Sequence, residues 1–139
     1  MNLIAVFVEN KPGQTARITK LLAGVSVNIC WVTIANSGSF GVMKFLVNDC
    51  DLAVRTIRAA GLMVSLLQVL AVEVANKPGA LQSVAECLSR NQLNLDNCSG
   101  FVAKDRAVLI IEVHELERAT TVLQKANVRL LNQEELLRF

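Results

Sequence analysis

The chain has 139 residues, which is enough for one ordinary domain or for two very small ones. Its 14 basic and 12 acidic residues give a net charge of +2 and form no polybasic cluster, so the composition argues against nucleic acid as a partner. The apolar fraction of 53% is high, yet no run approaches the roughly 18 apolar residues of a membrane-spanning helix, so we expect no membrane contact and a homodimer whose interface takes up the excess apolar surface.

The first half of the chain predicts four strands and two helices. An alternating apolar run at residues 4–8 predicts the first strand, and Pro12-Gly13 predicts that a helix starts shortly after it. Apolar residues recur at helical spacing around residues 15–22 and 53–60. Ser37-Gly38-Ser39 between two β-like runs predicts an antiparallel hairpin. The predicted strands are residues 4–8, 27–36, 40–48 and 62–66.

The second half repeats the first at a constant offset. Asn10-Lys11-Pro12-Gly13 returns 66 positions later as Asn76-Lys77-Pro78-Gly79, and the remaining sequence aligns at this offset without a gap. The third helix is expected to bury an apolar stripe that begins at Leu81 and ends at Leu88.

These patterns predict an α+β fold of two ferredoxin-like βαββαβ units in tandem, each an antiparallel sheet with helices on one face. The two units are expected at residues 1–66 and 67–131. Residues 132–139 are expected to form a short closing segment, with Asn132 as the cap of a final helix.

The loop after the first strand has the chemistry of an anion site. Pro12 fixes φ at a helix start, and Gly13 lets backbone amides approach a ligand. Unpaired N–H groups at a helix N-terminus favour a carboxylate, and Lys11 adds positive charge beside them. The amide of Asn10 suits the ammonium and carboxylate of an amino acid, but Asn is also a common helix cap. Both alternatives apply to Asn76 in the second copy.

A second pair of asparagines opens the second strand of each unit. Asn28 and Asn94 offer the same kind of amide contacts to an amino acid. Asn also favours the turn that precedes a strand, so a purely structural role is an equal alternative.

Two copies of one series of motifs therefore cover nearly the whole chain: an apolar strand, Asn-Lys-Pro-Gly, an amphipathic helix, and then Val27-Asn28-Ile29 or Leu93-Asn94-Leu95. This series resembles the ACT domain. The resemblance implies a βαββαβ fold, a regulatory role without enzyme activity, and a small amino acid held at an interface between two ACT domains. In serine-sensing members, the asparagines at these places contact the ligand. The expected ligand contacts are Asn10, Lys11, Pro12, Gly13, Gln14, Asn28 and Ile29 in the first copy, and Asn76, Lys77, Pro78, Gly79, Ala80, Asn94 and Leu95 in the second.

The two copies differ directly after the loop glycine. Gln14 and Thr15 of the first copy correspond to Ala80 and Leu81 of the second. The polar pair offers hydrogen bonds at the helix start that the apolar pair lacks. The sequence therefore leaves open whether both copies bind the same ligand.

We expect a freestanding regulatory protein that passes its ligation state to a metabolic enzyme. One alternative is an activating subunit of a biosynthetic enzyme, similar to the small subunit of acetolactate synthase. A second alternative is a small acylphosphatase-like enzyme on the same scaffold. Such an enzyme needs an arginine in its phosphate loop, whereas the first arginine after Gly13 is Arg17, so we do not expect enzyme activity.

The cysteines and the histidine predict no metal site and no cofactor. The four cysteines form no C-x-x-C pair, and His114 is the only histidine. Cys30 and Cys98 are expected to be small apolar core residues on the second strands. Because the chain starts without a basic leader, we expect reduced cysteines and a cytoplasmic protein.

Overall fold

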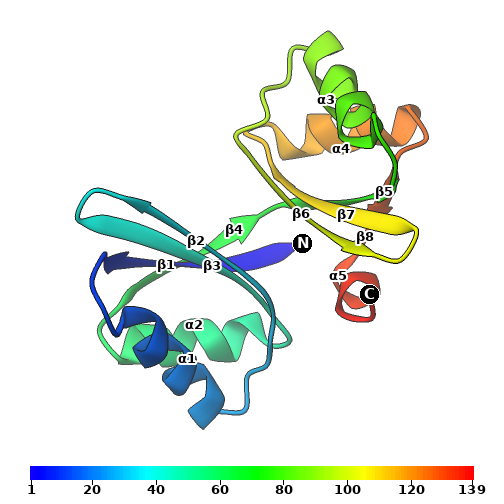
Figure 1. Ribbon diagram of the computed structural model, residues 1–139. Helices are drawn as coiled ribbons and strands as arrows, with labels where there is room; N and C mark the ends of the chain where they lie inside the picture. Colours follow the sequence, from blue (N-terminus) through cyan, green and yellow to red (C-terminus); the bar gives the residue numbers. More distant parts are fainter. The chain divides into compact units, whose positions relative to one another are not determined.

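The computed structural model describes residues 1–139 and contains two compact units (Figure 1). The first repeat consists of Asn2–Leu67, and the second repeat consists of Gln68–Phe139 together with Met1. Met1 joins the second repeat through two hydrogen bonds to Val69. The Met1 ammonium donates to the Val69 carbonyl at 3.0 Å, and the Val69 N–H donates to the Met1 carbonyl at 2.9 Å.

Each repeat runs strand, helix, strand, strand, helix, strand, which confirms the predicted order. None of the helices has the length and apolar character that crossing a bilayer requires. The first repeat comprises β1 (Asn2–Glu9), α1 (Gln14–Gly24), β2 (Ile29–Ser37), β3 (Phe40–Val47), α2 (Cys50–Ala59) and β4 (Met63–Gln68). The second repeat comprises β5 (Leu70–Ala75), α3 (Ala80–Arg90), β6 (Asn97–Ala103), β7 (Arg106–Glu112), α4 (Leu116–Lys125) and β8 (Arg129–Leu131), and adds α5 (Gln133–Leu137).

The two sheets have the same topology and the same register. Their strand orders are β2-β3-β1-β4 and β6-β7-β5-β8. Val6 pairs with Met43 in the first sheet, and Val72 pairs with Leu109 in the second, so the pairing itself is reproduced 66 positions later. The predicted α+β fold of two ferredoxin-like units is therefore confirmed.

Helices cover one face of each sheet, as Figure 1 shows for α1 and α2 and for α3 and α4. Strand residues alternate between the two faces, and most side chains of β1, β3, β5 and β7 that point toward the helices are buried. The first core includes Ile4, Val6, Ile18, Leu22, Phe45 and Ile57, and the second includes Val72, Val84, Leu88, Ile111, Ala119 and Leu123. The opposite face of each sheet, here called the outer face, is free of these four helices.

The predicted stripes of α1 and α3 are wrong at their first member, whereas those of α2 and α4 start at buried alanines as expected. In α3, Val84 and Leu88 are buried, but Leu81 remains 48% exposed. A residue three positions before Val84 is turned about 60° from it around the helix, so Leu81 lies at the margin of the buried face. In α1, the buried face starts instead at Gln14 and continues through Ile18 and Leu22.

A glycine follows the end of α2, and an asparagine caps the start of α5. Gly61 follows α2 with a φ of 78°, in the left-handed region that favours glycine. Asn132 caps α5 as expected. Its side chain accepts a hydrogen bond from the Glu135 N–H, and the Glu135 carboxylate accepts one from the Asn132 N–H, both at 2.9 Å.

Candidate functional site

The loop between the first strand and first helix of each repeat depends on a left-handed glycine. Gly13 has a φ of 91° and Gly79 a φ of 86°, and each directly precedes its helix. No side chain caps either helix, but the first N–H of α3, that of Ala80, donates to the Lys77 carbonyl at 3.3 Å. The loop of the first repeat therefore keeps the uncapped donors that the sequence predicted for an anion site.

Asn10 and Asn76 are not helix caps. The Asn10 side chain donates to the carbonyl of Gly38 at 3.1 Å, and the Asn76 side chain donates to the carbonyl of Lys104 at 3.2 Å. The Gly38 carbonyl belongs to the turn between β2 and β3, and the Lys104 carbonyl belongs to the turn between β6 and β7. The capping alternative is therefore wrong, and each asparagine instead ties its loop to the neighbouring hairpin. A ligand contact through the remaining amide groups stays a prediction.

The sequence predicted that Asn28 and Asn94 open the second strand of each repeat. In the structure, both residues lie before that strand. Asn28 precedes β2 by one residue, and its backbone N–H donates to the Asn48 side chain at 2.9 Å. Asn94 lies three residues before β6, and its side chain donates to the carboxylate of Asp96 at 2.6 Å. The neighbouring predicted contacts, Ile29 and Leu95, pack against the two hydrophobic cores.

A cavity of about 420 Å³ opens in the first repeat beside this loop. This volume falls in the range of small-molecule sites. Of the residues predicted as ligand contacts, Lys11 and Gln14 line it. Sequence reasoning missed its apolar wall, which includes Phe7, Phe40 and Met63.

Charges of both signs line the same cavity. The ammonium of Lys11 lies 2.6 Å from the Glu9 carboxylate, and this hydrogen bond and charge hold the pKa of Glu9 below its usual value. Arg17 also lines the cavity, and its guanidinium donates to the Ala60 carbonyl at 3.1 Å. Arg17 lies within α1 and not in the loop, so the structure does not present the arginine loop of an acylphosphatase.

Gln14 is the buried polar group of this site. The residue is 9% exposed and lines the cavity, and its amide makes no hydrogen bond to another residue. Its amide atoms are not fully buried, so water reaches them from the cavity. A ligand in the cavity would replace this water as the hydrogen-bond partner.

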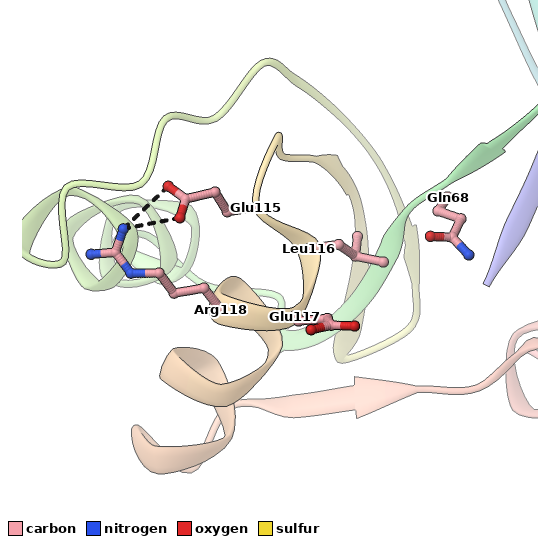
Figure 2. Close-up of a pocket in the computed structure, with 5 residues that line it drawn as sticks. All are labelled: Gln68, Glu115, Leu116, Glu117 and Arg118. Carbon is pink, nitrogen blue, oxygen red and sulfur yellow. Dashed lines mark hydrogen bonds and ion pairs between the residues drawn. The ribbon is translucent and has the colours of Figure 1, made fainter.

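A second hollow, of about 540 Å³, lies at the start of α4 (Figure 2). Figure 2 shows Arg118 and Glu115 pointing toward each other, and their closest atoms are 3.1 Å apart. The Arg118 guanidinium also donates to the Asn91 carbonyl at 2.7 Å. Ion pairs occur in both places, but Leu116 is the only apolar side chain that lines this hollow, so it lacks the apolar wall of the loop cavity.

The cysteines follow the expectation only in part. Cys98 is partly buried against the second core, and this burial raises the pKa of its thiol. Cys30 is exposed, so its predicted core role is wrong. The register of β2 shifts between Ile29 and Trp31, and this irregularity on the edge strand leaves Cys30 facing solvent. No group of three or more metal-binding side chains occurs in the structure.

The whole chain, residues 1–139, matches the family model of an ACT domain pair. No curated protein matches it significantly. Protein BT0572 from Bacteroides thetaiotaomicron has a similar structure, with a TM-score of 0.93 and 26% identity over 99% of this chain and 96% of its own. The ligand-free regulatory subunit of aspartate kinase from Thermus thermophilus has a TM-score of 0.65 and 16% identity, over 90% of this chain and 91% of its own. The second similarity is one of fold.

Proposed function

This chain belongs to the ACT domain pair family, and we propose that it is a regulatory protein that binds an amino acid and modulates a metabolic enzyme. The observation that carries the proposal is the cavity of the first repeat, which combines charges of both signs with an apolar wall. The head of an α-amino acid carries an ammonium and a carboxylate, for which charges of both signs are complementary. The apolar wall is complementary to an apolar side chain.

The loop provides complementary groups for both charges of such a ligand. We propose that the carboxylate lies near Lys11, Arg17 and the uncapped N–H groups that begin α1, and that the ammonium lies near Glu9. The proposed contacts in the first repeat are Asn10, Lys11, Pro12, Gly13, Gln14, Asn28 and Ile29.

Regulation requires that binding favours one state of the assembly over another. The outer face of the first sheet carries apolar side chains around a shallow hollow of about 300 Å³, including Phe7, Ala35, Phe40 and Val42. We propose that a second copy of the chain covers this face, so that the ligand lies at an ACT–ACT interface of a homodimer. A ligand that bridges two chains would shift their arrangement by a coupling of about 1–3 kcal/mol.

The proposed role is not enzymatic, and the proposed location is the cytoplasm. The titratable side chains that line the cavity are Glu9, Lys11 and Arg17, without the nucleophile and base pair that acyl transfer requires. An activating subunit of a biosynthetic enzyme is the alternative within the same family. It would hold its enzyme whether or not an amino acid is bound.

Isothermal titration calorimetry of the full chain against the twenty amino acids tests the proposal. We expect saturable heat with at least one of them, and a loss of that heat when Lys11→Ala and Arg17→Ala are combined. Lys20→Ala, which removes an exposed charge on the same helix, is the matched control. Absence of heat with all twenty amino acids would refute an amino-acid sensor.

A further inference from the structure

The apolar wall of the first-repeat cavity has charged counterparts in the second repeat. Phe7, Phe40 and Met63 are exposed by 45%, 65% and 71%, respectively. The residues 66 positions later are Glu73, Arg106 and Arg129.

The charged counterparts neutralise one another. Arg106 lies 3.4 Å from one carboxylate oxygen of Glu73, and Arg129 lies 3.4 Å from the other. Arg129 also lies 3.4 Å from the carboxylate of Glu135 in α5. The contact of Arg129 with Glu73 is one of charge only, because that carboxylate oxygen has no hydrogen-bond partner. The Glu73 side chain is 12% exposed, so little of it remains open to a ligand.

The C-terminal residues cover the same part of the second sheet's outer face. Figure 1 shows α5 on the side of the second sheet that faces away from α3 and α4. The guanidinium carbon of Arg106 lies 4.5 Å from the centroid of the Phe139 ring, and this ring packs edge-on against Phe101 at 5.9 Å. Leu136 of α5 is buried. The second repeat therefore fills this part of its outer face with its own C-terminal residues.

The polar side of the cavity is also lost in the second repeat. Glu9, Gln14 and Arg17 correspond to Ala75, Ala80 and Ser83, and only Lys11 has a charged counterpart, Lys77. The second repeat thus keeps the loop backbone, with its left-handed Gly79, but lacks most of the side chains that would recognise an amino acid.

We propose that the first repeat alone binds the ligand, at one site per chain, and that the ligand is an α-amino acid with a large apolar side chain. This inference rests on the proposed function. The charged head would meet Lys11, Arg17 and Glu9, the unpartnered amide of Gln14 would complete its hydrogen bonds, and the side chain would lie against Phe7, Phe40 and Met63. A polar side chain would lose its hydration on this wall without gaining a partner.

Calorimetry with two sets of amino acids tests the ligand class. We expect at least one of L-leucine, L-methionine and L-phenylalanine to bind with a stoichiometry of one per chain. L-serine, L-aspartate and L-lysine are expected to bind at least tenfold more weakly. Tighter binding of a polar amino acid, or two sites per chain, would overturn this inference and leave the proposed sensor standing. Absence of binding by every amino acid would overturn both.

Variants that exchange residues between the repeats test the location. Gln14→Ala and Met63→Arg install the residues of the second repeat, and each is expected to weaken binding of the apolar amino acid at least tenfold. The matched control is Val102→Asn, which installs a first-repeat residue at an exposed position of the second repeat and should leave binding unchanged. Circular dichroism confirms that each variant is folded. Unchanged affinity in folded Gln14→Ala and Met63→Arg would place the site elsewhere and overturn the inference.

Discussion

The loop between the first strand and the first helix of each repeat requires a glycine at the equivalent position. At Gly13 and Gly79 the left-handed backbone turns the chain from the strand into the helix, and a Cβ built on either residue meets no atom within 4 Å. Space therefore does not prevent a side chain there. The constraint is the backbone conformation itself, which costs an L-residue about 1–2 kcal/mol.

Gly13→Ala tests this conformational constraint. We expect the free energy of unfolding to fall by about 1–2 kcal/mol, measured by urea denaturation of the full chain. Gly24→Ala is the control, because Gly24 ends α1 with an ordinary φ and equally open surroundings. That variant should be neutral or more stable by up to about 1 kcal/mol. Equal destabilisation of both variants would contradict the explanation.

The ion pair of Glu9 with Lys11 predicts a pH effect inside the cavity. The folded-state pKa of Glu9 is lowered, so the pair is fully formed above the ordinary pKa of glutamate and is lost as pH falls through the lowered value. Lys11→Met should raise the pKa of Glu9 toward its ordinary value, as followed by the carboxyl ¹³C shift. Lys77→Met should not move it, since Ala75 stands at the position equivalent to Glu9. A pKa of Glu9 that stays lowered in Lys11→Met would show that another group causes the shift.

At the residue scale, the sequence predicted the loop better than the cavity. Pro-Gly at a helix start and the adjacent lysine are local signals, and the structure places Lys11 and Gln14 at the cavity. The wall residue Phe40 gave no such signal, because whether an apolar strand residue is covered depends on what packs over the sheet. A usable signal was present in the repeat itself, where aromatic Phe7 corresponds to charged Glu73.

Among the elements, α3 contains two leucines that look equivalent in the sequence but differ in burial. Both belong to the apolar stripe predicted from helical spacing, but Leu88 is 1% exposed and Leu81 is 48% exposed. Periodicity indicates which side of a helix is apolar. It does not indicate how far the sheet beneath extends, so the edge of the buried face appears only in three dimensions.

Alanine substitutions measure this difference between the two leucines. Leu88→Ala should lower the free energy of unfolding by about 2–5 kcal/mol, because it leaves a cavity in the second core. Leu81→Ala should cost less than about 1 kcal/mol. Both values come from urea denaturation with two-state analysis. A large loss for Leu81→Ala would mean that another surface covers it in solution.

For the whole molecule, the outer face of the first sheet is the place where assembly is expected. Ala35 lies on this face opposite Val42 and lines its apolar hollow. Ala35→Glu would bury an unpaired carboxylate in the proposed homodimer, which costs about 3 kcal/mol or more and raises the dimer dissociation constant at least roughly 100-fold. Sedimentation velocity at micromolar concentration should then show monomers.

The control for assembly is Arg55→Glu, which places the same charge on the exposed side of α2. This variant should sediment as the unmodified chain does. A monomeric unmodified chain, or a dimer that survives Ala35→Glu, would move the interface away from the outer face.

The gap-free offset of 66 positions has a further use in protein engineering. The register of the second sheet reproduces that of the first. Each residue of the binding loop therefore has a structurally equivalent backbone position in the second repeat. Ala75→Glu, Ala80→Gln and Ser83→Arg would transplant the polar half of the cavity without changing loop length. The remaining obstacles are the charged residues Glu73, Arg106 and Arg129 at the place of the apolar wall and the C-terminal residues that cover them, so a second receptor also requires an apolar wall and a chain shortened before α5.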